Sequence, residues 1–260
     1  MNFTLKDQVA IVTGGRQGLG RTLCETFLAE GVSVVTCARD GVELDERVTT
    51  WREQFGDRIH GIQADVSRLK DIERLVATAT DVYGGIDILV NNAATSAAGS
   101  TATLTDEQWR LEIDVKLMSM IRTARLCAPI MKTRGGGSII NINAIFARQP
   151  NLTFYASSVV RAGSLNLTKL LAKEFAADGI RANAIGLGVI ATDAWKVWYD
   201  PAQGSYEEFL QGQAETFGVP MGRLGDPQEV ANLVTFLCSD AAPYISGTQI
   251  DIDGALAAYS

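Results

Sequence analysis

Short runs of β-branched and apolar residues alternate with longer segments of helical periodicity, and this alternation restricts the possible folds more than any other feature. The seven runs cover residues 8–14, 32–38, 59–65, 86–92, 137–143, 180–186 and 248–254. Helices are expected near 18–30, 41–54, 69–83, 105–132, 153–177 and 227–239. Strands that alternate with helices build a parallel sheet covered on both faces. The pattern predicts one α/β domain over residues 1–260, a Rossmann-type doubly wound parallel sheet of about seven strands.

Residues 188–226 follow this pattern least well and are expected to be an insertion of loop and helix. The segment carries Trp195, Trp198, Tyr199, Phe209, Phe217 and Pro220. Two interpretations remain open at this point, a lid over a substrate and a local satellite core. A lid of this composition would favour a small apolar or aromatic substrate.

Charge and cysteine usage narrow the classes of partner and compartment. The formal net charge is −7 and the pI about 4.8, which argues against nucleic acid and against anionic membranes. The N-terminus lacks the features of a signal peptide, and no stretch approaches eighteen apolar residues. The four cysteines lie far apart and are expected to be free thiols, so the predicted location is cytoplasmic.

A single histidine limits the chemistry that the chain can perform. His60 lies in a predicted strand, without a nearby cysteine or second histidine, so no metal site is expected. A Ser-His-Asp hydrolase is also disfavoured, because its general base would have to be this one residue.

The loop after the first predicted strand, TGGRQGLG over 13–20, has the composition of a phosphate cradle. Gly14 permits a tight turn, Gly18 lets the backbone approach a pyrophosphate, and Gly20 lets the following helix pack on the strand. The N-terminus of that helix offers free N–H groups and a partial positive charge. Because the glycines lie at the first strand–helix junction, they predict dinucleotide binding. The cradle also includes Arg16, Gln17 and Leu19.

The end of the second predicted strand bears on which dinucleotide binds. An acidic residue at this place would hold a ribose 2′-hydroxyl, but the chain has Ala38 followed by Arg39. Arg39 and Arg16 would suit a 2′-phosphate. The sequence therefore favours NADP over NAD, although both arginines could also be solvated surface residues.

Three further motifs complete a family pattern. These are Ala64-Asp65-Val66, Asn91-Asn92-Ala93 and SGTQIDIDGA over 246–255. With the glycine-rich loop, they make the whole chain resemble the short-chain dehydrogenase/reductases, an oxidoreductase family. The resemblance implies that Asp65 and Val66 lie along the adenine, that Asn92 and Ala93 support the cofactor ribose, and that Thr192 contacts the nicotinamide amide.

The active-site tetrad of that family, Asn, Ser, Tyr and Lys, is altered here. Tyr155 matches the tyrosine, which would also lie against the cofactor, but Val159 occupies the lysine position four residues later. The serine position falls on Asn143 or Ala144, and the asparagine position on Lys116. In the family, the lysine's charge lowers the pKa of the phenol beside it, and one charge about 4 Å away supplies roughly the 4 kcal/mol needed.

A relocated cation could restore such a site. We hypothesise that Lys116 sends its ammonium toward Tyr155, into space left by Val159, and that Asn143 donates a hydrogen bond to the substrate oxygen. Alternatively, Lys116 is exposed or paired with Glu112 one turn earlier, and the site has little or no activity. Arg161, two residues past Val159, could contribute to non-redox chemistry at this site, but it is expected to face solvent or a subunit contact.

Three functions follow from these possibilities. The first is an NADP-dependent oxidoreductase that transfers a hydride to or from a carbonyl or alcohol carbon. The second is a non-redox enzyme on the same scaffold, such as a dehydratase, cyclase or lyase. The third is a catalytically inactive nucleotide-binding homologue. By resemblance, a homo-tetramer or homo-dimer is expected through the helices near 105–132 and 153–177 and through the C-terminal strand.

Overall fold

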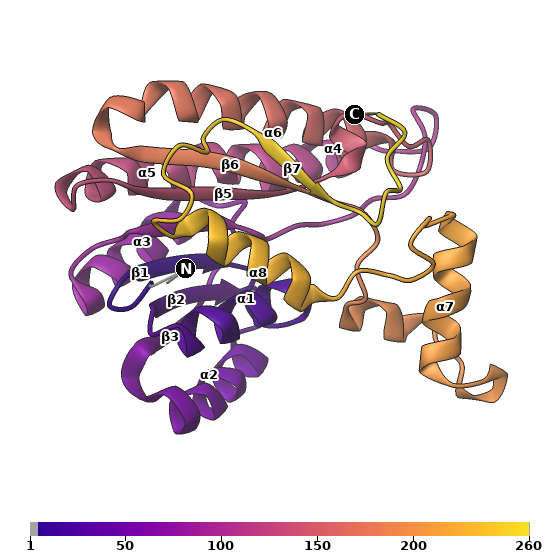
Figure 1. Ribbon diagram of the computed structural model, residues 1–260, viewed down its shortest axis with the longest axis horizontal. Helices are drawn as coiled ribbons and strands as arrows, with labels where there is room; N and C mark the ends of the chain where they lie inside the picture. The colour runs from indigo at the N-terminus through magenta and orange to yellow at the C-terminus, as the bar shows by residue number, and fades with distance from the viewer. Residues whose placement is uncertain (1–4, 260) are drawn as a thin grey trace.

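A seven-stranded parallel sheet lies at the centre of the computed structural model, which describes residues 5–259 (Figure 1). The strand order is β3-β2-β1-β4-β5-β6-β7, with every pairing parallel. The predicted doubly wound α/β fold is therefore confirmed. The strands are β1 (Val9–Thr13), β2 (Ser33–Ala38), β3 (Ile59–Gln63), β4 (Ile88–Asn91), β5 (Gly137–Ala144), β6 (Ile180–Leu187) and β7 (Gln249–Ile252).

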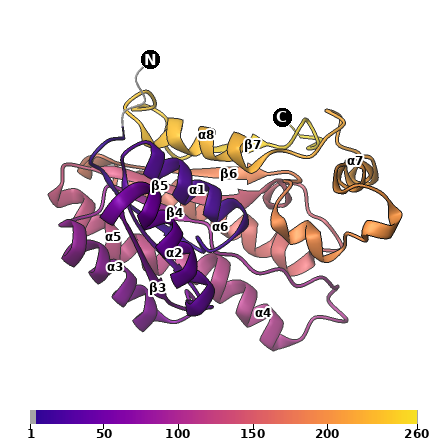
Figure 2. The ribbon, with the colours of Figure 1, turned by 90° about the horizontal axis from the view of Figure 1, so that it is seen from below.

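Helices cover both faces of the sheet (Figure 2). One face packs against α1 (Gly18–Ala29), α2 (Gly41–Phe55) and α8 (Pro227–Cys238), and the other against α3 (Leu69–Tyr83), α5 (Ser119–Thr133) and α6 (Tyr155–Glu174).

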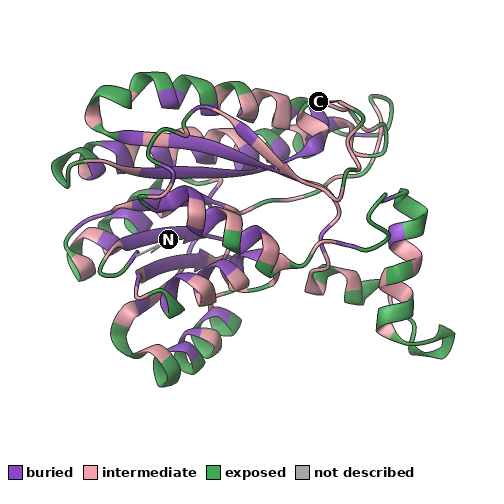
Figure 3. Ribbon diagram, viewed as in Figure 1, coloured by how far each residue is buried: buried purple, intermediate pink, exposed green. Residues whose placement is uncertain are grey.

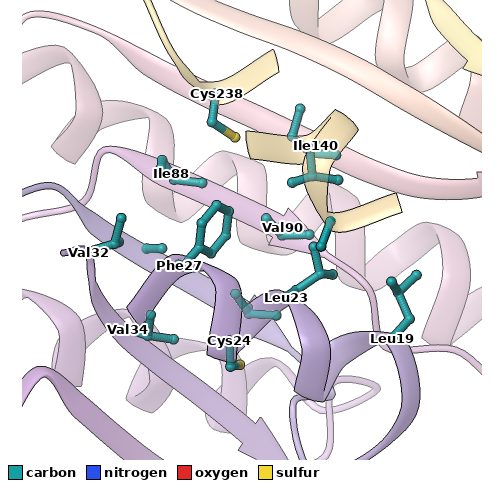
Figure 4. Close-up of a cluster of buried hydrophobic side chains, with 14 of the residues drawn as sticks. Leu19, Leu23, Cys24, Phe27, Val32, Val34, Ile88, Val90, Ile140 and Cys238 are labelled. Carbon is teal, nitrogen blue, oxygen red and sulfur yellow. The ribbon is translucent and has the colours of Figure 1, made fainter. Parts of the chain in front are cut away.

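Residue alternation along β1 explains the two layers. Ala10 and Val12 belong to the first core, and Val9 and Ile11 to the second, because successive strand residues point to opposite faces. Figure 4 shows the first core, in which Phe27 of α1 lies among side chains from the strands and from α8. Buried residues follow the strands and the inner helix faces in Figure 3.

Helix ends coincide with residues that satisfy the free backbone groups. Thr105 and Gln108 form a capping box at the start of α4 (Asp106–Ile113), and Asp226 and Glu229 form another at α8. Gly84 ends α3 in the left-handed conformation. These local signals explain why most of the predicted boundaries agree with the structure within a few residues.

The predicted helix over 105–132 is interrupted in the structure. Between α4 and α5 lies η2 (Asp114–Met118), a π-helical turn in which the Ser119 N–H bonds the Asp114 carbonyl five residues earlier. Such turns insert one extra residue into a helix and are frequent at functional sites. Lys116 lies in this turn.

The weakly patterned segment 188–226 forms a small unit at one side of the molecule (Figure 1). It contains η5 (Asp193–Val197), η6 (Pro201–Gln203) and α7 (Tyr206–Phe217), and the remaining short helices are η1 (Gly56–Arg58), η3 (Ile145–Ala147) and η4 (Ala176–Asp178). The Trp195 ring lies 5.7 Å from Trp198 and 5.9 Å from Phe217. The aromatic side chains contact one another, although Trp198 and Phe217 remain exposed. The lid and the satellite core both stay predictions.

All four cysteines are buried free thiols, as expected. Burial raises the pKa of Cys24, Cys127 and Cys238 to about 12. Within residues 5–259, no helix is both long and apolar enough to cross a membrane.

Candidate functional site

A cleft of about 340 Å³ opens beyond the carboxyl ends of β1, β2 and β4. The strand order reverses between β1 and β4, the place where open α/β sheets bind ligands. Twelve residues predicted to bind cofactor line the cleft: Gly14, Arg16, Gln17, Gly18, Leu19, Gly20, Arg39, Asp65, Val66, Asn92, Ala93 and Thr192. Tyr155 is not among the lining residues. The lining also includes residues that were not predicted, among them Ala38, Asp40, Thr95, Val115 and Ala194.

Backbone geometry fixes the floor of this cleft. Gly14 and Gly18 have φ values of 75° and 55°, which side chains disfavour. A Cβ on Gly20 would lie 2.0 Å from the Gly14 carbonyl oxygen, so only glycine fits. The Asn92 amide donates to the carbonyls of Thr13 (2.9 Å) and Gly14 (3.2 Å), which ties β4 to the loop.

The N-terminus of α1 is suited to an anion. The Gln17 side chain does not cap it, and its first turn holds no acidic residue. The Asp193 carboxylate, from η5, takes a hydrogen bond from the Gly18 N–H, whereas the N–H groups that follow and the partial positive charge of the helix are left to the cleft. Together with the glycines, this fits the pyrophosphate of a dinucleotide.

Two arginines lie at the far end of the cleft, where a 2′-phosphate was expected. Arg39 is exposed at the end of β2, whereas Arg16 forms an ion pair with Glu43 of α2. Nearby, Asp65 accepts hydrogen bonds from the Ser67 N–H and hydroxyl. Partial burial raises the pKa of Asp65, but these two bonds and the charges of Arg68 and Arg39 outweigh it. The pKa of Asp65 is therefore lower than its ordinary value.

A second polar cluster lies where η2 meets α6, and it consists of three buried side chains and the half-buried Arg161. The Lys116 Nζ donates to Glu112 Oε2 (2.6 Å) and to Ser157 Oγ (3.0 Å). The side chains of Lys116 and Glu112 are 2% and 1% exposed. The Ala97 N–H donates to Glu112 Oε1 (3.2 Å). Arg161 adds a second cation, because its Nε donates to Ser157 Oγ (3.3 Å). We call Glu112, Lys116, Ser157 and Arg161 the Lys116 cluster.

The cluster shifts the titration of both of its cations. Burial, and then the charge of Arg161, lower the pKa of Lys116 to about 8, and Glu112 partly offsets this effect. Burial lowers the pKa of Arg161 to about 10. An amine with a pKa near neutrality can both give and take a proton under ordinary conditions.

No hydrogen bond joins Lys116 to Tyr155 among residues 5–259. Two residues along a helix correspond to a rotation of about 200°, so Tyr155 and Ser157 leave α6 on nearly opposite sides. Tyr155 lies edge-on to Trp109, with 6.3 Å between ring centroids. Its hydroxyl forms no hydrogen bond within residues 5–259. The Lys116–Tyr155 pair in a cofactor complex stays a prediction.

Two expectations about the neighbourhood are wrong. Val159 is 55% exposed, so it leaves no empty space in the site. Arg161 does not face solvent, because its Nη1 donates to the Ile142 carbonyl (3.2 Å) at the end of β5.

Asn143 is fully buried in β5. Its Nδ2 donates to Gln249 Oε1 (3.0 Å) and to the Arg161 carbonyl (3.2 Å). Both amide hydrogens are engaged by the protein, so donation to a substrate would require one of these bonds to break. Ala144, the other candidate for the serine position, is buried at the end of the same strand.

Ser157 and Arg161 are the members of the site that sequence reasoning missed. They lie four residues apart on α6, so both project from one side of the helix. This is the spacing of the tyrosine and lysine in the family pattern, shifted by two residues. The spacing was the signal that could have identified them.

Comparisons with known proteins agree with this architecture. A family model described as enoyl-(acyl carrier protein) reductase matches residues 14–256. The human dehydrogenase/reductase SDR family member 4 is 34% identical over 96% of this chain and 87% of its own length.

Two similar solved structures have NADPH bound. The L-sorbose reductase of Gluconobacter frateurii, in complex with NADPH and L-sorbose, has a TM-score of 0.93 at 32% identity, with both chains fully covered. A short-chain oxidoreductase of Pseudomonas aeruginosa PAO1, described as containing an atypical catalytic center, was solved with NADPH. It has the same TM-score, identity and coverage.

Proposed function

Because the chain belongs to the short-chain dehydrogenase/reductase family of oxidoreductases, we propose that it is an NADP-dependent oxidoreductase acting on a carbonyl or alcohol carbon. The observation that carries the catalytic part of this proposal is the 3.0 Å hydrogen bond from the buried Lys116 ammonium to the Ser157 hydroxyl. The substrate is a small molecule with a reducible carbonyl or an oxidisable alcohol.

The cleft supports the cofactor assignment. The N-terminus of α1 would hold the pyrophosphate, Arg39 and Arg16 the 2′-phosphate, and Thr192 the nicotinamide end. When bound, the nicotinamide supplies or accepts a hydride. The NADPH complexes of the G. frateurii and P. aeruginosa proteins support the phosphorylated form of the cofactor.

Lys116 and Ser157 carry the proton in this proposal. During reduction, the Ser157 hydroxyl gives its proton to the substrate oxygen and takes one from the Lys116 ammonium. The resulting amine is reprotonated from water. During oxidation, the neutral amine accepts the alcohol proton through the same hydroxyl. No phenol is required, because an ammonium with a pKa of about 8 is itself an effective acid near neutrality.

The direction of the pH dependence follows from this assignment. Reduction needs the Lys116 ammonium, so kcat/KM for reduction should fall about tenfold per pH unit above pH 8. Oxidation needs the neutral amine and should rise over the same range. A reduction rate that stays flat from pH 6 to 10 would count against Lys116 as the acid.

The proposal is tested by NADPH absorbance at 340 nm with a panel of ketones, ketoses and quinones. Oxidation of NADPH by at least one carbonyl is expected. Titration with NADPH, followed by fluorescence, separates the alternatives. Tight binding without turnover would favour a nucleotide-binding homologue or non-redox chemistry, and the absence of binding would contradict the cofactor assignment itself.

We further propose a homo-tetramer or homo-dimer built through α5 and α6. In support, Leu170 of α6 is 61% exposed, and a groove between the two helices includes Ile121, Leu167 and Phe175. Light scattering on the purified protein tests this arrangement, and a monomer at micromolar concentration would contradict it.

A further inference from the structure

Glu112, the one carboxylate of the Lys116 cluster, has no role in the mechanism given above. Glu112 is the only carboxylate among residues 5–259 that is fully buried, and Lys116 is the only fully buried cation there. The two lie four residues apart, across the junction of α4 and η2, and their polar atoms are 2.6 Å apart. Such a pair is costly to bury and is weak evidence for a role in stability.

Glu112 is held in place from two sides. One carboxylate oxygen accepts the Lys116 ammonium and the other accepts the Ala97 N–H, from the segment that follows β4. The carboxylate therefore has a fixed position relative to the cleft edge. It restricts the direction in which the Lys116 side chain extends, and that direction leads to Ser157.

The charges around Lys116 come from two elements. Glu112 acts from its own helix, and Arg161 acts from α6 with the opposite effect. Ser157, also from α6, is a neutral contact. Two cations converge on one hydroxyl, so without Glu112 their mutual repulsion would favour a neutral Lys116 amine.

We propose that Glu112 is a positioning residue, which keeps Lys116 protonated and directed at the Ser157 hydroxyl. The expected effect on carbonyl reduction rests on the proposed function. The expected effect of Glu112 on the Lys116 pKa does not. Glu112 touches neither substrate nor cofactor in this account. It acts by selecting the charge state and the direction of the one group that supplies the proton.

The test is a direct measurement of the Lys116 pKa by NMR of protein labelled at lysine Cε. The chain has seven lysines, and Lys116→Arg identifies the resonance. In Glu112→Gln, the pKa of Lys116 should fall from about 8 by about one to three pH units. The pH profile of carbonyl reduction should move down by the same amount, so that the rate at pH 7 falls about tenfold for a two-unit change.

Two further variants keep the result interpretable. Glu107→Gln removes an exposed carboxylate from the same helix and should leave both the Lys116 pKa and the profile unchanged. Glu112→Asp should lower the pKa of Lys116 less than Glu112→Gln, because the charge is kept but withdrawn by one methylene. If Glu112→Gln does not fold, this smaller change remains measurable.

The two proposals fail in different ways. A Lys116 pKa that is the same in wild type, Glu112→Asp and any folded Glu112→Gln overturns the role of Glu112, even if the enzyme is active. If no carbonyl is reduced by the wild type, the NMR titration still decides the inference, because it requires no substrate.

Discussion

The cofactor cleft and the Lys116 cluster lie toward the same edge of the sheet, yet they are built from different parts of the chain. The cleft is formed by backbone, namely glycines with positive φ, a helix N-terminus and carbonyls held by Asn92. The cluster is formed by four side chains from α4, η2 and α6, which three hydrogen bonds join to one another and further bonds tie to the backbone of Ala97 and Ile142. A backbone site tolerates changes in neighbouring side chains, whereas a buried polar network depends on each of its members.

The largest difference should appear when backbone geometry is broken in the cleft. In Gly20→Ala, the new methyl group meets the Gly14 carbonyl at 2.0 Å, so the loop must move. We expect NADPH binding to be lost, and the free energy of unfolding to fall by about 1–3 kcal/mol. Fluorescence titration and denaturant unfolding measure these effects.

Gly212→Ala is the matched control. Nothing lies within 4 Å of its added methyl group in α7, so binding should be kept and stability should rise by up to about 1 kcal/mol. Equal loss in the two variants would mean that the cradle does not depend on glycine at position 20.

Breaking the cluster should abolish turnover and spare the cleft. Lys116→Met should lower kcat by about 10²–10⁴-fold, because the proton donor is gone, while the Kd for NADPH stays the same. The variant also leaves the buried Glu112 carboxylate without its cation, which typically costs about 3–5 kcal/mol.

The double variant Glu112→Gln/Lys116→Met separates the two effects. It should recover most of the lost stability without recovering any turnover. Full activity in Lys116→Met, measured by NADPH absorbance, would show that the proton comes from elsewhere.

Side chains at the rim of the cleft should matter less than its backbone. Arg39→Ala should weaken NADPH binding about tenfold and leave NADH binding unchanged, because it removes one charge-assisted bond to the 2′-phosphate. Parallel titrations with the two cofactors measure this ratio. Arg47→Ala, an arginine of α2 outside the cleft, is the control. An equal effect on NADH and NADPH would contradict the assignment of Arg39.

The smallest effect is expected at Tyr155, and it tests whether this residue acts together with the Lys116 cluster. Tyr155→Phe should leave the reduction rate within about twofold of wild type, because the phenol lies against Trp109 and forms no hydrogen bond with Lys116 among the described residues. The same assay applies. A loss of a hundredfold or more would instead favour the pairing of Tyr155 with Lys116 in the cofactor complex.

The difference between the two regions also explains what the sequence could predict. The glycine loop is local, because each residue acts through the conformation of its own backbone. Residues 14–20 therefore predicted the floor of the cleft, and strand alternation predicted the sheet. The cluster is not local, since Lys116 and Ser157, which it joins, lie 41 residues apart along the chain.

The missing members had a signal that the tyrosine obscured. Taking Tyr155 as the reference on α6 places Val159 in the site and Ser157 on the opposite side of the helix. In the structure the two positions are exchanged: Val159 is exposed, and the Ser157 hydroxyl accepts a hydrogen bond from Lys116. Packing against β5, β6, η3 and η2 together fixes which side of α6 is turned inward, and the spacing counted from Tyr155 alone points to the other side. The π turn itself had no sequence signal that we can identify.

That wide turn at η2 has a mechanical consequence. In a straight α-helix from Asp106 to Thr133, the side that faces the sheet at one end would determine which side faces it at the other. The extra residue absorbs about 100° of rotation, so α5 can keep Ala124 and Cys127 against the sheet while the preceding segment is oriented independently. The orientation of α5 on the sheet is therefore independent of the orientation of α4 and Lys116. Substitutions near residue 116 can change the polar cluster without changing how α5 packs against the sheet.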